Sequence, residues 1–422
     1  MRLEVASFPV RRAGLGTVTA YGDGTLTIDS ARIRAFVCQD PRIEDVELHL
    51  VHPGESVRVL RALDAIEPLH KPGGDVHAFP GFNGPPHTVG SGRTHRLAGF
   101  TVIPIAEFPF PVSGVQAFEE GVIEMSGPGA AYAGCADHVN LLLHARPGTI
   151  ASNVDYDDAL RRAALRVAET LAAATANLVV SDVETFELRA PARPLPRLVW
   201  VHQVRAQGPM VQSFLYGHEM SGIVPTILHP NELLDGALVS GNYKTGTKTP
   251  TCRHTRHPAS LSLYARHGRD LEFAGVIVAR GHHETEALKQ RSAHFVAKLA
   301  AMLRADGAVA TYEGTGNTHI DFMLTVQALE RAGIPAASVV HEYGGPDGTD
   351  PSLVDFVPEA VALASSGGID RRLRLPAVAR VIGGTHLMHR GEVAADALEL
   401  PIQELYAATV EMHARGVLAE EH

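Results

Sequence analysis

Three segments of the sequence combine acidic, amide or phenolic side chains with glycines: residues 312–321, 341–350 and 365–370. Each segment lies at the end of an apolar run that predicts a buried strand. Open α/β sheets bind ligands beyond the carboxyl ends of their strands, and glycine lets a backbone approach a ligand closely. The pattern therefore predicts a ligand site at one edge of a sheet. The alternative is that these residues only form turns and helix N-caps, which Asn and Asp do routinely.

The side chains in these segments divide by the chemistry that they offer. Carboxylates and phenols can transfer protons, whereas amides and glycine backbone can hold polar groups. The candidate catalytic residues are Glu313, Glu342 and Tyr343. The candidate substrate-binding residues are Gly314, Gly316, Asn317, Asp347, Gly367 and Gly368.

A second candidate site lies in residues 236–258, GALVSGNYKTGTKTPTCRHTRHP. Cys252, His254 and His257 fall within six residues there and could bind Zn²⁺, with His218, Glu219 or His229 as a fourth ligand. The spacing matches no common zinc module. The chain has 23 histidines, so such a cluster also arises by chance.

The first part of the chain, residues 1–190, predicts a β-rich α+β domain. Short apolar runs broken by Gly and Pro favour strands joined by tight loops. From Asp157 the apolar residues recur at helical spacing, which predicts a long alanine-rich helix to about Ala176. Three prolines in residues 188–198 indicate a connection to a second domain.

The second part, residues 191–422, predicts an α/β domain that contains the 236–258 segment. Apolar runs at 273–279, 307–314, 337–345 and 360–368 alternate with amphipathic helical patterns. Strands about 30 residues apart with helices between them favour a doubly wound, mostly parallel sheet of Rossmann-like βα units. Right-handed crossovers would place the carboxyl ends of the strands on one edge.

The bulk composition excludes several classes of protein. A formal net charge of −10 argues against nucleic-acid binding. No apolar stretch approaches the length of a membrane span, and residues 1–12 lack the pattern of a signal peptide. Three scattered cysteines form no disulfide framework. We therefore expect a cytoplasmic protein with no nucleic-acid or membrane partner.

Several long strings, in order along the chain, resemble one family. They are HPGESVRV (52–59), VGSGRTH (89–95), EEGVIEMSGPGAAY (119–132), DGALVSGN (235–242) and EYGGPDG (342–348). With these strings the chain resembles the self-processing α/β proprotein of component B of glycine, sarcosine and betaine reductase, and more remotely the D-proline reductase proprotein. In the related partner subunit, the junction that corresponds to residues 313–317 carries the selenocysteine.

The resemblance makes Tyr243 the residue that departs from the family. In the family the SGN string is followed by cysteine, and the chain breaks between Asn and Cys to leave a pyruvoyl group. The reaction needs a heteroatom on Cβ, which attacks the preceding carbonyl and is then eliminated. Tyr243 carries its oxygen across a rigid ring and has no leaving group on Cβ. We therefore expect an uncut chain without pyruvoyl, and no other cofactor except zinc at the site named above.

Three functional hypotheses follow from the resemblance and the departure. The first is a subunit that acts with a partner resembling the selenocysteine-bearing component B subunit, on an amino-acid-derived or peptidyl amine. It would use acid/base catalysis for C–N bond chemistry, condensation or cyclisation, with Tyr243 as a proton donor and Asn242 binding substrate. The second is a non-catalytic scaffold that stabilises a catalytic partner. The third is a metal-dependent hydrolase or cyclase that uses Cys252, His254 and His257.

Overall fold

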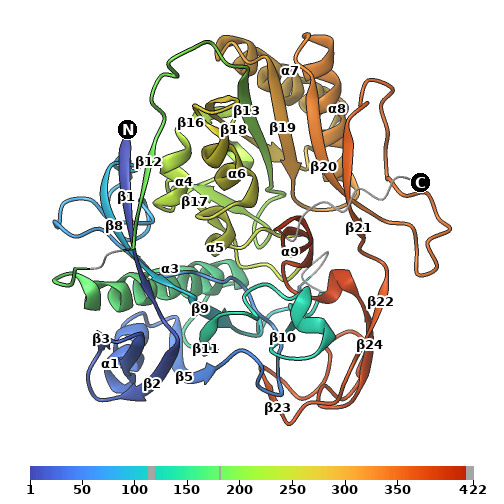
Figure 1. The fold of residues 1–422 in the computed structure, drawn as a ribbon. Coiled ribbons are helices and arrows are strands. Elements are labelled where there is room, and N and C mark those ends of the chain that lie inside the picture. Colours follow the sequence, from blue (N-terminus) through green and yellow to red (C-terminus); the bar gives the residue numbers. More distant parts are fainter. Residues whose placement is uncertain (113–118, 180–181, 415–422) are drawn as a thin grey trace.

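The computed structural model describes residues 1–112, 119–179 and 182–414. Figure 1 shows a large sheet with its helices in the upper half of the molecule. The strands within residues 12–51 and the last strands of the chain lie in the lower half, and the first strand runs along the left side. The fold is mixed α/β with several sheets, and this confirms the predicted class at that level.

Three sheets are built from the first part of the chain. The sheet β12-β1-β8-β7 consists of Val183–Glu187, Arg2–Pro9, Gly92–Ala98 and Leu69–His70. The sheet β5-β11-β9 consists of Ile43–Val51, Val139–Pro147 and Phe100–Ile105. The sheet β2-β4-β3 consists of Arg12–Gly16, Thr25–Asp29 and Ala20–Gly22, and helix α1 is Ser30–Val37. The β-rich character predicted for this part is therefore present.

Helix α3 (Asn153–Ala172) is the long alanine-rich helix of this part. The Ser152 side chain caps it by accepting a hydrogen bond from the backbone N–H of Asp155. Its leucine, valine and alanine side chains form a buried face at helical spacing, and the helix packs against β7 and β9. The predicted helix is confirmed, but it begins before Asp157 because the cap lies upstream of that residue.

The upper region contains a six-stranded sheet in the order β16-β18-β13-β19-β20-β21. Its strands are Thr226–Leu228, Glu272–Gly281, Arg197–Arg205, Gly307–Tyr312, Ala336–Glu342 and Leu363–Gly368. β16 is antiparallel to β18, whereas the other neighbouring pairs are parallel. Helices α7 (Glu286–Met302) and α8 (Asn317–Arg331) connect β18 to β19 and β19 to β20. The sheet is thus rich in parallel pairs, and its doubly wound arrangement stays a prediction.

Strand β13 lies in the middle of this sheet, between β18 and β19. Its residues 199–205 are all buried, as expected for a strand that is covered on both faces. Because β13, β19 and β20 are parallel, their carboxyl ends at Arg205, Tyr312 and Glu342 share one edge. The chain reaches β18 and β19 on opposite sides of β13, and such a reversal marks the point where α/β sheets bind ligands.

The chain between β13 and β18 forms a small sheet and three short helices. The sheet β15-β14-β17 consists of His218–Glu219, Ser213–Leu215 and Leu238–Ser240. The helices are α4 (Pro230–Leu234), α5 (Thr251–His254) and α6 (Pro258–Arg266). Residues 236–258 therefore run from the end of α4 through β17 and α5 to the start of α6.

The start of helix α4 makes stability depend on pH. The ring Nδ1 of His229 accepts a hydrogen bond from the backbone N–H of Asn231, and Glu232 completes a capping box. Burial lowers the pKa of His229 to about 4. Between about pH 6.5 and 4 the unfolded chain therefore binds more protons at this residue than the folded chain does, so folding stability falls as the pH falls.

We expect this residue to account for about 1 to 2 kcal/mol of the stability lost between pH 7 and pH 4, after discounting for its partial exposure to solvent. Urea unfolding of the wild type and of His229→Asn at the two pH values measures it. The Asn variant keeps a capping side chain but cannot titrate, and should lose less stability. Equal losses in both proteins would contradict the assignment.

The last strands of the chain return to the N-terminal part, as Figure 1 shows in its lower right. β23 (Arg380–Ile382) is parallel to β6 (Val57–Val59), which is antiparallel to β10 (Ile123–Glu124). β22 (Arg372–Leu375) pairs with β24 (Leu398–Pro401), and α9 is Ala408–Ala414. The predicted boundary at 190/191 falls between β12 and β13. Because β6 and β10 precede this boundary and β23 follows it, strands from both predicted domains share the sheet β10-β6-β23.

A buried ion pair fastens these C-terminal strands to the N-terminal part. The side chains of Arg58 and Glu124 are fully buried and hydrogen bonded to each other. The Arg58 guanidinium also donates to the carbonyls of Pro376 and Asp396, each at 2.9 Å, and to that of Ala394. One cation thus joins β6 and β10 to the loops on either side of β23.

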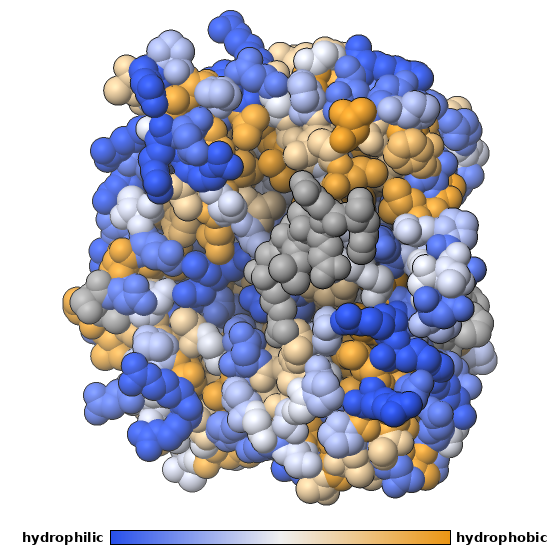
Figure 2. All heavy atoms as spheres, turned by 45° about the vertical axis from the view of Figure 1, so that its right-hand side comes forward, coloured by the Kyte–Doolittle hydropathy of each residue, from blue (hydrophilic) through white to orange (hydrophobic). Residues whose placement is uncertain are grey.

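Among the described residues, no helix is long and apolar enough to span a bilayer. On the face drawn in Figure 2, hydrophobic and hydrophilic side chains are interspersed.

Candidate active site

The segment after β17 crosses the interior of the protein. Every residue from 241 to 250 is buried, although this stretch contains no regular helix or strand. Buried backbone must be hydrogen bonded, and here the partners come from distant segments. The N–H of Gly246 donates to Gln403, Thr409 donates to the carbonyl of Gly246, and Gly314 donates to that of Thr247. The loop is therefore held against both α9 and the end of β19.

Gly241 is required where the segment begins. A Cβ at this position would lie 2.0 Å from the carbonyl oxygen of Gln212, so a side chain cannot fit. The next residue, Asn242, donates from its amide to the carbonyl of Asp157 in α3, at 2.9 Å. The backbone N–H of Tyr243 turns back to the carbonyl of Gly241, at 3.0 Å. These contacts fix the peptide bond between residues 242 and 243.

A buried lysine, Lys248, holds the carbonyls around this bond. Its ammonium donates to the carbonyls of Gly241 at 2.6 Å and Tyr243 at 3.2 Å, and also to that of Leu63. It lies 4.6 Å from the centroid of the Tyr243 ring. Burial lowers the pKa of Lys248 to about 8. The sequence alone gives no sign of this role for Lys248.

Tyr243 and Glu313 meet at the edge of the six-stranded sheet. Glu313 directly follows β19, and each of the two residues is 1% exposed. The Tyr243 hydroxyl donates to Glu313 Oε2 at 3.1 Å, and the backbone N–H of Arg205 donates to the same oxygen at 2.9 Å. Two of the predicted catalytic residues are thus brought together, at the carboxyl ends of β13 and β19.

Two histidines lie beside the same carboxylate. His254, the last residue of α5, places Nε2 3.3 Å from Glu313 Oε1. His202 of β13 has its ring centroid 5.4 Å from that of His254. The nearest possible ligand atoms of His202, His254 and Glu313 lie within 4.8 Å of one another, and the three residues are buried. The groups at the sheet edge therefore form one compact, water-poor cluster.

Burial shifts the protonation of this cluster toward neutral forms. It raises the pKa of Glu313 to about 7. Burial, followed by the Glu313 charge, raises the pKa of the Tyr243 phenol well above its usual value. Burial, followed by the neighbouring His202, lowers the pKa of His254 well below its usual value. At neutral pH His254 is therefore an uncharged imidazole.

A group of carboxylates surrounds Lys244 on the other side of Tyr243. Burial lowers the pKa of Lys244 to about 8, although the charges of Glu120, Glu119 and Glu404 act to raise it. Burial also raises the pKa of Glu119 to about 8. One oxygen of each of these three carboxylates is buried without a hydrogen-bond partner among the described residues. The cluster can accept hydrogen bonds that a ligand supplies.

The other candidates on the sheet edge have mainly structural contacts. The ring of Tyr343 packs against that of His341, and its hydroxyl lies 3.2 Å from Nε2 of that histidine. Burial raises the pKa of Tyr343 to about 12. The carbonyl of Glu342 accepts from the N–H of Ile369. Asp347 is exposed and accepts hydrogen bonds from Thr349.

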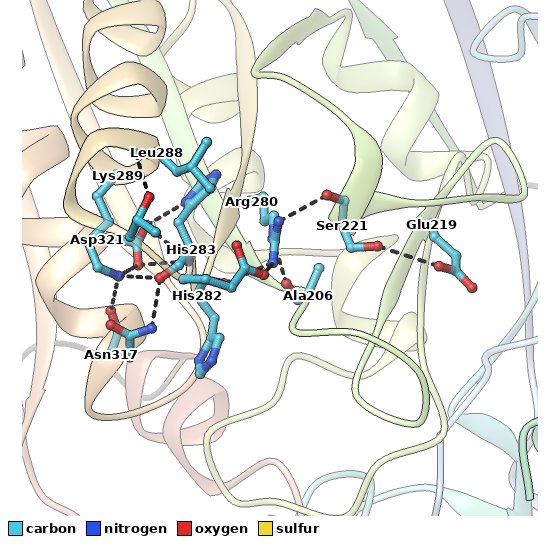
Figure 3. Close-up of polar contacts among 12 residues, drawn as sticks. Ala206, Glu219, Ser221, Arg280, His282, His283, Leu288, Lys289, Asn317 and Asp321 are labelled. Atoms are coloured by element: carbon cyan, nitrogen blue, oxygen red, sulfur yellow. Dashed lines mark hydrogen bonds and ion pairs between the residues drawn. The ribbon is translucent and has the colours of Figure 1, made fainter.

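Asn317 belongs to a polar cluster at the end of β18, which Figure 3 shows. Its amide donates to the carbonyl of His283 at 2.9 Å. Asp321 binds His283 Nδ1 and the Lys289 ammonium, each at 2.6 Å. The amide thus ties the start of α8 to the loop that follows β18.

The candidate glycines all lie in backbone that turns sharply or ends a strand. Gly314, Gly316 and Gly367 have φ values of 90°, 56° and 105°, which favour glycine. Gly316 is the N-cap of α8, and Gly367 and Gly368 end β21. These φ values and positions agree with a turn-forming role. The substrate-binding role of these glycines stays a prediction.

Of the three residues of the predicted zinc site, His254 and His257 both pack against the ring of His202, whereas Cys252 lies beside another cysteine. The Sγ atom of Cys252 lies 3.3 Å from that of Cys135, and both thiols are buried. The ring of His257 caps α6 by accepting from the N–H of Ala259, and stacks 4.4 Å from Trp200. Only His254 joins the cluster with Glu313. The sequence offers no signal for His202, because a histidine in a buried strand resembles any other core residue.

Comparisons with known proteins show the family to which the chain is related. Residues 1–414 match the family of glycine/sarcosine/betaine reductase component B subunits. The chain is 31% identical to "Glycine reductase complex component B subunits alpha and beta" of Acetoanaerobium sticklandii over 430 residues, which cover 98% of each chain. It is 34% identical to "Sarcosine reductase complex component B subunit alpha" of Peptoclostridium acidaminophilum, over 91% of this chain and 89% of the relative.

More distant similarity extends to a second kind of reductase. The D-proline reductase proprotein of Acetoanaerobium sticklandii is 23% identical over 80% of this chain and 54% of its own length. No solved structure matches the chain. The chain belongs to the glycine/sarcosine/betaine reductase component B family, as its sequence motifs predict.

Proposed function

We propose that this chain is a component-B-type subunit that stays uncut between residues 242 and 243 and works without a pyruvoyl group. The observation that carries the proposal is the Tyr243 side chain itself. Its Cβ bears an aromatic ring, and its hydroxyl is hydrogen bonded to Glu313 at 3.1 Å. A phenol held there cannot attack the carbonyl of Asn242, and elimination across Cα and Cβ has no leaving group.

The proposed chemistry uses the hydrogen bonds that remain. Tyr243 donates a proton or hydrogen bond to the substrate, and Glu313 positions the phenol and, in its protonated form, returns a proton to the phenolate. The loop is rigid because its carbonyls are bound by Lys248 and its backbone by α9. Groups held in this way need little reorganisation when a substrate binds.

We propose an amine derived from an amino acid or a peptide as the substrate. The partnerless carboxylate oxygens of Glu119, Glu120 and Glu404 can bind an ammonium group. Arg205, whose Nη1 has no hydrogen-bond partner among the described residues, can bind a carboxylate. The curated relatives are named as components of reductase complexes, so we further propose a second component-B-like subunit as the partner.

Mass spectrometry under denaturing conditions tests the uncut chain. We expect a single species with the mass of residues 1–422, and no mass shift after treatment with borohydride or hydroxylamine, since both reagents act on a ketone. Two fragments, one of them carrying a group that reacts with hydroxylamine, would refute the proposal.

A conservative substitution tests the role of the phenol. Tyr243→Phe keeps the ring and removes only the hydroxyl that Glu313 binds, so we expect a loss of about 10²- to 10⁴-fold in turnover by the two-subunit complex. Tyr21→Phe, which removes a hydroxyl bound to the carbonyl of Pro9 in the N-terminal region, is the control and should keep full turnover.

The scaffold hypothesis gives a different result in the same assay. If the chain only stabilises a partner, Tyr243→Phe has wild-type turnover, and the isolated partner retains the chemistry. Either finding would overturn the catalytic role proposed for Tyr243.

A further inference from the structure

We propose that His202, His254 and Glu313 bind one divalent transition-metal ion, with Zn²⁺ as the favoured metal. The three side chains come from β13, α5 and the residue after β19, which are far apart in the sequence and meet at the edge of the sheet. Two imidazoles and one carboxylate are a ligand set that zinc and other first-row divalent metals use in proteins.

The first support is the separation of the ligand atoms. Two atoms bound at about 2.0 to 2.2 Å to a tetrahedral ion lie roughly 3.3 to 3.6 Å apart. His254 Nε2 and Glu313 Oε1 lie 3.3 Å apart. The ligand atom of His202 lies within 4.8 Å of both. The arrangement is therefore close to a metal site before any ion is bound.

The second support is that His254 and one oxygen of Glu313 lack hydrogen bonds. Neither ring nitrogen of His254 has a hydrogen-bond partner among the described residues, nor has Glu313 Oε1, although the two residues are 1% exposed. A buried polar atom without a partner costs about 1–3 kcal/mol, and more when it is charged. A metal ion would satisfy the imidazole nitrogen and the carboxylate oxygen at once.

The third support is the set of contacts behind the ligands. His202 Nδ1 lies 2.9 Å from Oγ1 of Thr311, which also accepts a hydrogen bond from the Trp200 indole. The other oxygen of Glu313 is held by Tyr243 and by the backbone of Arg205. Metal ligands are commonly oriented by such hydrogen bonds from behind, which leave the binding atoms facing the ion.

The ligand set also leaves room for chemistry. Three protein ligands on a four-coordinate ion leave one position for water or substrate, as in catalytic zinc sites. The hydroxyl of Tyr243 is hydrogen bonded to Oε2 of Glu313, one of the proposed ligands. If the proposed function holds, the ion supplies the electron-withdrawing group that the missing ketone would have provided. Metal binding itself does not depend on that function.

The positive charge of Lys248 would repel a cation bound at this site, because it lies close enough to shift the pKa values of both Glu313 and His254. This ammonium donates hydrogen bonds to three backbone carbonyls, and the dipoles of these carbonyls offset part of its positive charge. Metal ligands bind in their deprotonated forms, so two imidazoles and the Glu313 carboxylate would together carry one negative charge toward the ion.

Elemental analysis of the purified full chain, loaded with zinc and dialysed against a weak chelator, tests the proposal. We expect one zinc per chain, and a loss of at least tenfold in occupancy for His254→Gln. The matched control is His144→Gln, because His144 lies with Glu47 and His49 in a partly exposed group that could bind metal on the surface. This control should retain the buried ion. Loss of zinc in His144→Gln and retention in His254→Gln would overturn the proposal.

X-ray absorption on the wild-type protein is a second test that needs no variant to fold. We expect nitrogen and oxygen ligands and no sulfur. A sulfur ligand would contradict the proposed ligand set, and a protein without zinc would exclude the site. Thr311→Val should weaken zinc binding about 10- to 100-fold by releasing the His202 ring. These outcomes are separate from the mass of the chain, so the uncut-subunit proposal can stand or fail independently.

Discussion

Tyr243→Cys is expected to make the chain cut itself between residues 242 and 243. The substitution restores the SGN-Cys string that precedes the break in the family that this chain belongs to. Gly241, Asn242 and Lys248 still hold the backbone on both sides of the bond. The new thiol is placed to attack the Asn242 carbonyl through a five-membered ring, which turns the peptide bond into a thioester. Elimination of the thiocarboxylate leaves dehydroalanine at residue 243, and water then hydrolyses its imine form to the α-keto acyl terminus with release of ammonia.

The matched control is Tyr243→Ala, which leaves the same cavity and has no thiol. Removing a buried aromatic ring costs about 3–5 kcal/mol in either variant, so a difference between them reports on chemistry and not on stability. We expect masses for 1–242 and 243–422 from the Cys variant, with the second reacting with hydroxylamine, and one uncut mass from the Ala variant. A Cys variant that folds and stays whole would mean that more than the residue at 243 has changed.

The second large effect is expected on stability, from the buried pair Arg58 and Glu124. Arg58→Ala leaves the Glu124 carboxylate buried without its cation, and leaves the carbonyls of Pro376 and Asp396 without a donor. Breaking a buried pair on one side costs about 3–5 kcal/mol. The midpoint of urea unfolding should fall accordingly.

The double variant Arg58→Met, Glu124→Leu removes both charges and is the control. It should recover part of the loss, since no uncompensated charge stays buried, but not all of it, because the carbonyls remain unpaired. A single variant that loses less than about 1 kcal/mol would show that the pair contributes little to holding the C-terminal strands.

The residues of the site could be predicted from the sequence more fully than the contacts between those residues. Glu313 was found because a polar residue after an apolar strand marks the end of that strand. Tyr243 was found because the resemblance placed it where a cysteine belongs. The contact between the two was not predicted, because it joins the loop after β17 to the end of β19 through tertiary packing alone.

Residues whose role depends on distant partners gave no signal. His202 lies in a run of buried strand residues, and Lys248 lies among threonines and glycine, so neither differs from a core or turn residue in the sequence. Cys252, His254 and His257 are neighbours in the sequence, but in the fold only the two histidines pack against His202, and Cys252 lies beside Cys135. Short spacing predicts a shared site only where the backbone between the residues points their side chains the same way.

The order of strands in the six-stranded sheet has a consequence for any form of this protein that is broken at residue 242. β13 and β16 come from the piece before the break, and β18, β19, β20 and β21 come from the piece after it. The last piece also supplies β23, which pairs with β6 of the first. The two polypeptides would thus share sheets and would elute together from any column run under native conditions. They would form a heterodimer without a separate step of association.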